Sequence, residues 1–143
     1  MYDLLSKPMN MLYALGISLA ALILLSPILV FGLAWAKINL FYYGKQVQRR
    51  QRVSYMVALV AGSASTLAYL GYWGWRVCQM YHATIPFVAL LTIERLMYVS
   101  RALSIAAIVC LLIGRGPYRA LVVLATLWVM FQVWVHGGII HWA

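Results

Sequence analysis

Four hydrophobic stretches divide the chain, and short polar segments separate them. A transmembrane helix needs about 20 consecutive apolar residues, and each stretch reaches that length. We expect spans at about 12–36, 53–75, 85–113 and 120–140, all within a single membrane domain of residues 1–143. The pattern therefore predicts an all-α integral membrane protein of four transmembrane helices with short loops.

The first two stretches carry no charged residue, but each contains residues that affect how a helix bends or packs. Ser26-Pro27 lies near the middle of the first stretch, and we expect a kink there because proline removes a backbone donor. Ala58, Gly62 and Thr66 recur at intervals of four in the second stretch. Such a face lets helix backbones approach closely. The sequence leaves open whether its partner lies in this chain or in another subunit.

The third stretch, 85–113, is longer and contains Glu94, Arg95 and Arg101. As one helix its 29 residues would extend for about 43 Å, which exceeds the hydrocarbon core of roughly 30 Å. The alternative is a span of 96–113 preceded by an interfacial segment. We favour the long helix.

These charges suggest a polar layer inside the membrane. Glu94, Tyr98 and Arg101 share one helix face, which Ser104 continues, and three residues of other spans fall at a depth similar to Glu94: Ser18, Thr66 and Gln132. One interpretation is a proton or ion site, or a site for a polar partner. The other is that Arg95 and Arg101 extend to the interface and Glu94 neutralises one of them. We favour the second, because a single carboxylate makes a poor proton relay.

Composition excludes the main alternatives to a membrane protein. Hydrophobic residues make up 66% of the chain and charged residues 9%, and mean hydropathy is +0.90. Soluble domains are about 45–50% apolar and about 25% charged. A disordered chain would need low hydrophobicity, so neither class fits.

The net charge of +9 comes from 11 Lys and Arg against 2 acidic residues, and its distribution predicts an orientation. Seven of these cations flank the two links that follow the first and third spans: Lys37, Lys45, Arg49, Arg50, Arg52, Arg115 and Arg119. The opposite side carries Lys7 and Arg76. The positive-inside rule then places both basic links in the cytoplasm and both termini outside. We expect the bacterial inner (cytoplasmic) membrane, or a membrane derived from it.

The basic link also has candidate partners. Lys45, Arg49, Arg50 and Arg52 form a cluster that would attract anionic lipids. Docking of an acidic partner is the alternative for this cluster, and we do not expect nucleic acid to bind.

Histidines supply the candidate metal ligands. His82, one helical turn after Cys78, and His136 are weak candidates for holding a metal or a haem. Their spacing matches no ligand motif, and an interfacial position explains them better. We therefore expect no metal and no cofactor. We also expect no enzyme, since phosphate-binding loops, zinc motifs and a catalytic triad are all missing from the sequence.

The leading functional hypothesis is a non-enzymatic membrane subunit, packed against copies of itself or against other membrane subunits. One alternative is a small pore-forming (holin-like) or proton-coupled transport protein, because holins and small multidrug-type transporters share this gross size. A second alternative is a redox subunit that binds haem or metal near the histidines.

Overall fold

The computed structural model describes residues 2–81 and 87–142, with side chains described at 10–76, 78 and 94–135. It contains four helices: α1 (Tyr2–Tyr42), α2 (Arg49–Tyr81), α3 (Phe87–Ile113) and α4 (Arg119–Trp142). No strand occurs in the described part of the chain. Among the residues whose side chains are described, three segments are long and apolar enough to cross a membrane: Asn10–Tyr42, Arg49–Arg76 and Glu94–Ile113. The expectation of an all-helical membrane protein is thereby confirmed in outline.

The helices extend beyond the apolar stretches that predicted them. α1 continues to Tyr42 and α2 begins at Arg49, so the link expected over 37–52 shortens to 43–48. α2 then continues to Tyr81, through most of the expected polar link. Hydropathy marks the hydrocarbon-facing part of a helix, whereas aromatic and basic residues at the interface continue the same backbone hydrogen bonding. α3 is continuous from Phe87, as the long-helix interpretation requires, and Ile85 and Pro86 lie outside the described residues.

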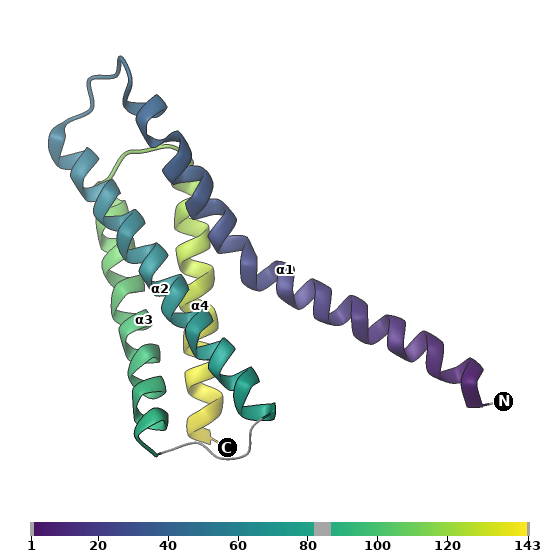
Figure 1. The fold of residues 1–143 in the computed structure, drawn as a ribbon. Helices are drawn as coiled ribbons and strands as arrows, with labels where there is room; N and C mark the ends of the chain where they lie inside the picture. The colour runs from purple at the N-terminus through teal and green to yellow at the C-terminus, as the bar shows by residue number, and fades with distance from the viewer. Residues whose placement is uncertain (1, 82–86, 143) are drawn as a thin grey trace.

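Helices α2, α3 and α4 form a bundle, and α1 joins it only through its C-terminal half (Figure 1). α2 and α3 run antiparallel and share the most extensive helix contact, while α1 packs on α2 and α4. The two basic links, between α1 and α2 and between α3 and α4, lie at the same end of the bundle (Figure 1). The N-terminal half of α1 diverges from the other helices.

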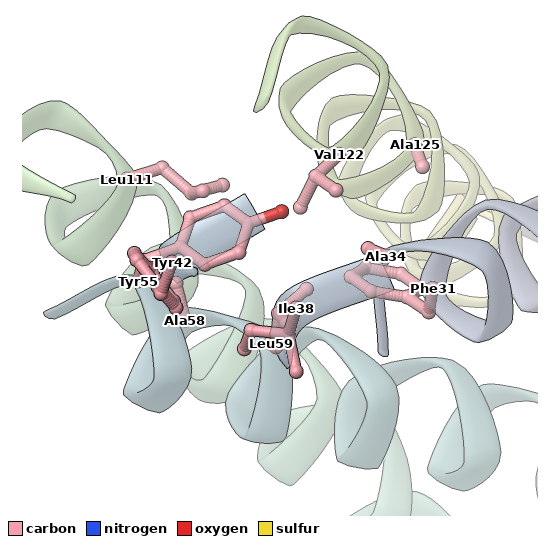
Figure 2. Close-up of a cluster of buried hydrophobic side chains, with 10 residues drawn as sticks. All are labelled: Phe31, Ala34, Ile38, Tyr42, Tyr55, Ala58, Leu59, Leu111, Val122 and Ala125. Atoms are coloured by element: carbon pink, nitrogen blue, oxygen red, sulfur yellow. The ribbon is translucent and has the colours of Figure 1, made fainter. Parts of the chain in front are cut away.

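All four helices contribute to the apolar core near the basic end, which Figure 2 shows in close-up. α1 provides residues at helical spacing, from Phe31 through Ala34 and Ile38 to Tyr42, and these are buried. Leu59 of α2, Leu111 of α3 and Val122 of α4 are among the side chains that they meet; the other members of the cluster are Tyr55, Ala58 and Ala125. Burial on this one side fixes the rotation of α1 about its axis.

The small-residue face of α2 is filled from within the chain. Ala58, Gly62 and Thr66 are all buried, and the Thr66 hydroxyl donates to the Gly62 carbonyl at 2.8 Å. A Cβ atom on Gly62 would lie 2.6 Å from the ring of Phe31 in α1. The sequence left open whether this face packs within the chain or against another subunit. In the structure it packs against α1 of the same chain.

Helix α1 continues through Ser26-Pro27 without interruption. Proline at 27 cannot donate to the carbonyl of Ile23, four residues earlier. The Ser26 hydroxyl donates to that carbonyl instead, at 2.8 Å. A neighbouring serine commonly satisfies backbone groups freed by proline in membrane helices, and here it preserves the helix at the point where α1 leaves the bundle.

The link between α3 and α4 packs directly on the start of α2. A Cβ atom on Gly114 would lie 2.8 Å from both the backbone nitrogen and the Cα of Tyr55. A Cβ atom on Gly116 would lie 2.2 Å from the Tyr55 ring. At the end of the same ring, the Tyr55 hydroxyl donates to the Pro117 carbonyl. Glycine is therefore required at both positions, because nothing larger than hydrogen fits between the two segments.

We predict that Gly114→Ala destabilises the bundle by about 1–3 kcal/mol, because the methyl group would meet backbone that cannot move aside. Gly71→Ala is the matched control, since a Cβ atom there meets nothing within 4 Å. It should leave stability unchanged or raise it by about 0.5–1 kcal/mol through better helix propensity. Equilibrium unfolding in mixed detergent measures both. Equal effects of the two substitutions would contradict the close contact with Tyr55.

Candidate functional site

Six basic side chains gather at one end of the bundle, drawn from two links and from the first turns of α2 and α4. All six are exposed: Lys45, Arg49, Arg50, Arg52, Arg115 and Arg119. Both links lie at this end (Figure 1). Glu94, the acidic residue whose side chain is described, lies near the opposite end of α3. The cluster predicted over Lys45–Arg52 is therefore larger than expected, because folding adds Arg115 and Arg119 to it.

Tyrosines hold the second basic link in place. The Tyr42 hydroxyl, at the end of α1, donates to the Arg115 carbonyl at 2.6 Å. The Tyr55 hydroxyl of α2 donates to the Pro117 carbonyl, and the backbone nitrogen of Arg115 donates to the Gln51 carbonyl at 3.3 Å. The link is thus bonded to α1 and to α2, so the charges of both links occupy one fixed surface.

Arg119 caps the end of α3. Its Nε donates to the Leu111 carbonyl at 3.1 Å, and its Nη2 donates to the Leu112 carbonyl at 3.2 Å. The last carbonyls of a helix lack intrahelical partners and carry partial negative charge, so a cation there is favourable. Arg119 is therefore partly neutralised by its own chain.

Among the described side chains, the remaining cations at this end contact only aromatic rings or form no side-chain interaction. Lys45 Nζ lies 4.1 Å from the centre of the Phe41 ring, and the Arg52 guanidinium lies 4.8 Å from that of Tyr42. Arg49 and Arg50 occupy the first turn of α2, where the helix dipole disfavours positive charge. An external anion at this surface would relieve both the dipole and the mutual repulsion of the arginines. The arrangement suits phosphate groups at a membrane surface.

The intramembrane polar residues do not form the layer that the sequence suggested. Ser18 lies on the part of α1 outside the bundle, and its hydroxyl donates to the Ala14 carbonyl at 2.8 Å. Thr66 bonds within its own helix. Glu94 and Arg95 are exposed, and Gln132 is half-buried on α4. The Ser18 and Thr66 hydroxyls are satisfied within their own helices, which removes their need for a shared layer.

Glu94 does not neutralise Arg101. No ion pair joins Glu94 to any side chain in the part of the chain whose side chains are described. Arg101 instead lies against two aromatic rings, with its guanidinium carbon 5.6 Å from the centre of the Tyr98 ring and 5.3 Å from that of Trp134 in α4. Its Nε–H is buried without a hydrogen-bond partner. On the expected shared face of α3, the structure therefore brings Arg101 against Tyr98.

The position of Arg101 makes this arrangement costly. It lies 14 residues, or about 21 Å, from the start of α3 at Phe87 and 12 residues from its end at Ile113. An arginine at the centre of a membrane helix costs about 2.5–3.5 kcal/mol on insertion scales. Cation–π contacts return about 0.5–2 kcal/mol. The two rings thus offset part of the cost and leave the charge without a counter-ion among the described side chains.

Three serines form a buried polar contact that sequence reasoning missed. Ser65 of α2 donates to the Ser100 carbonyl at 2.8 Å, and Ser100 of α3 donates to the Ser65 carbonyl at 3.0 Å. Ser104 lies 2.6 Å from the Ser65 hydroxyl. Ser104 was expected on the Glu94 face. Ten residues correspond to a rotation of about 80° from that face, which directs Ser104 into α2.

The candidate metal ligands His82 and His136 lie outside the residues whose side chains are described. Within the described part, no group of three or more His, Cys, Asp or Glu side chains could hold a metal ion. Cys78 is exposed and Cys110 is half-buried, and both are free thiols.

No family model, curated protein sequence or solved structure matches this chain. Proposals about its function therefore rest on its own residues and geometry.

We predict that Glu94→Gln leaves the free energy of unfolding within about 0.5 kcal/mol of the wild type, as for an exposed side chain without a partner. The measurement is equilibrium unfolding in mixed detergent, with Arg95→Gln as the control, since Arg95 is also exposed. A clear loss of stability in Glu94→Gln alone would show that the carboxylate has a partner and would revive the intramembrane relay.

Proposed function

We propose that the chain is a non-enzymatic membrane subunit that self-associates through the outward face of α1. The observation that carries the proposal is the N-terminal half of this helix, 10–26, which lies outside the bundle (Figure 1). Every side chain in that segment except the half-buried Leu24 is exposed. About 25 Å of apolar helix therefore contacts little of its own chain.

The exposed face of α1 has the spacing of a helix–helix seam. Leucines recur at alternating intervals of three and four from residue 12 to residue 40, interrupted at Ser26 and Ala36: Leu12, Leu15, Leu19, Leu22, Leu29, Leu33 and Leu40. Each of these side chains is more than half exposed. A seven-residue repeat of this kind directs two helices to supercoil with side chains interlocked. The face is self-complementary, so a second copy of α1 is the partner that fits it.

The bundle leaves this seam free because α1 binds its own chain through other residues. Phe31, Ala34 and Ile38, which face the core, also follow the three-and-four spacing, but on another side of the helix. In lipid, two leucine faces gain from close packing rather than from excluding water. The long uninterrupted seam supplies many such contacts, which supports self-association over a lone chain.

The interior supports a pore within one chain less well. The second buried cluster, toward the other end of the bundle, consists of Tyr69, Tyr72, Met97, Val129 and Val133. The buried hydroxyls of Ser65, Ser100, Ser104, Thr66 and Thr126 all bond to carbonyls. A filled core with satisfied hydroxyls offers no polar path through the described bundle.

We further propose that α4 is a fourth membrane span and that the basic end of the bundle faces the cytoplasm. The 24 residues of α4 extend for about 36 Å, enough to cross the hydrocarbon core. Both basic links then lie on the side that the positive-inside rule assigns to them. Their arginines and lysines would contact anionic lipids of that leaflet, at about 1 kcal/mol each.

Self-association predicts disulfide formation along the leucine face. In a Cys78→Ser/Cys110→Ala background, Leu19→Cys and Leu22→Cys should each crosslink in native membranes on mild oxidation. The adduct should run at twice the 16.1 kDa mass of the chain, because a parallel two-fold seam places each residue beside its own copy.

Ile17→Cys is the matched control, since Ile17 is 64% exposed against 58% for Leu19 but lies on the opposite side of the same helix. Equal crosslinking at Ile17 would show random collision. Adducts of another mass at Leu19 would identify a different subunit and overturn self-association.

Orientation can be measured with the chain's own thiol. Cys78 is exposed near the end of α2 that is remote from the basic links. In a Cys110→Ala chain, a membrane-impermeant maleimide should label Cys78 in intact cells. In Cys78→Ser/Cys110→Ala/Gln46→Cys, labelling should require permeabilisation, because Gln46 lies in the first basic link. The reverse pattern would place the basic end outside.

A further inference from the structure

The geometry around Arg101 points to a docking face for another membrane protein: we propose that a transmembrane helix of a different subunit packs where α3 meets α4 and presents an Asp or Glu to Arg101. The inference goes beyond self-association through α1, because it concerns another face of the molecule and another partner. It rests on the depth of Arg101, its missing counter-ion and the exposed apolar surface beside it.

Arg101 lies near the middle of the membrane. It follows Ser100, whose hydroxyl donates to the Ser65 carbonyl of α2, and Ser65 lies at the middle of the apolar stretch 53–75. The hydrocarbon core is about 30 Å thick, so the headgroups on either side are about 15 Å away. A counter-charge at this depth therefore has to be carried by a membrane-spanning segment.

The described part of the chain does not supply that counter-charge. The Arg101 Nε–H is buried without a hydrogen-bond partner, and no described side chain forms an ion pair with Arg101. Charged groups inside membranes are normally paired with one another. A guanidinium pairs best with a carboxylate, through two parallel hydrogen bonds. The partner that Arg101 requires is therefore a carboxylate at mid-membrane.

A second copy of the chain offers its acids at the wrong depth. The acids of the sequence are Asp3 and Glu94. Copies in one membrane share an orientation, so a second copy's Glu94 would lie seven residues, or about 10 Å, from Arg101 along the helix axis. Both side chains lean toward the helix N-terminus, so their directions do not close this gap. Asp3 precedes the first expected span, 12–36. An acid at mid-membrane therefore belongs to a different protein.

Exposed apolar side chains flank Arg101 on both helices. Tyr98 and Ile105 lie one turn before and one turn after it on α3, Phe131 and Trp134 share a face of α4, and all four are exposed. The guanidinium carbon lies 5.6 Å from the centre of the Tyr98 ring and 5.3 Å from that of Trp134. These rings restrain the cation in advance, so pairing costs less conformational freedom. A helix laid along this boundary would bury the apolar side chains, and its acid would fix the register.

The first experiment uses a synthetic leucine–alanine transmembrane helix with one Asp at its centre as the probe. Resonance energy transfer in phosphatidylcholine liposomes measures its association with the full chain, labelled at Cys78 in a Cys110→Ala background. The central Asp should strengthen association about tenfold over the same helix without an acid, and Arg101→Gln should remove that gain. Arg95→Gln removes an exposed cation from the same helix and should change association less than twofold.

A second probe tests depth on the chain with Arg101 intact, so it does not depend on the folding of a variant. When the Asp is moved seven residues from the centre, the synthetic helix should bind no better than the helix without an acid. Equal binding of the displaced and central Asp, or equal loss in Arg95→Gln, would overturn the proposal.

The native partner can be identified by photocrosslinking in native membranes. With p-benzoylphenylalanine in place of Phe131, the chain should form an adduct with another protein whose membrane-spanning sequence contains Asp or Glu, and Arg101→Gln should abolish that adduct. The same group in place of Leu67, an exposed residue of α2, is the control and should not form it.

The absence of an adduct at Phe131, an adduct at twice the mass of the chain, or a partner without a membrane acid would overturn the proposal. Disulfide formation at Leu19→Cys should be unchanged by Arg101→Gln. A failure of this docking face is therefore distinguishable from a failure of self-association through α1.

Discussion

Ser65 of α2 and Ser100 of α3 exchange hydrogen bonds through each other's carbonyls, with Ser104 bonded beside them. Only small side chains allow two helix backbones to come within reach of such an exchange. Gly114 continues the close approach at the basic end, where it touches the Tyr55 backbone. This contact fixes α2 against α3 and thereby determines where α4 and the second half of α1 can pack.

A bilayer supplies no water to satisfy polar groups, so each one must find a partner inside the protein or at the surface. The hydroxyls at 26, 66 and 126 meet this constraint by bonding to carbonyls of their own helices. Arg119 meets it by capping α3. Among the described residues, Arg101 does not meet it, because two rings surround its charge but no anion balances it. The indole N–H of Trp75 is also buried without a hydrogen-bond partner.

Sequence reasoning was effective for features that depend on composition along one helix. Uncharged apolar length predicted the membrane helices, and small residues predicted the close packing of α2.

Features that depend on rotation between helices were harder to predict. Ser100 carried no signal of its own, and Trp134 is an ordinary apolar position until α3 and α4 are set side by side. The pairing of Glu94 with an arginine was wrong for the described residues, because sequence proximity ignores the direction in which each side chain leaves the helix. The contact of Gly114 and Gly116 with Tyr55 joins residues far apart in the chain, which no pattern along one segment indicates.

The hydroxyl of Ser26 matters most before the bundle exists. Chains are synthesised from the N-terminus, so α1 enters the bilayer while α2, α3 and α4 are still being made. Pro27 would then leave the Ile23 carbonyl facing lipid with no neighbouring helix to satisfy it. Because Ser26 provides the missing donor from within the same turn, the Ile23 carbonyl is already hydrogen-bonded before the other three helices are synthesised.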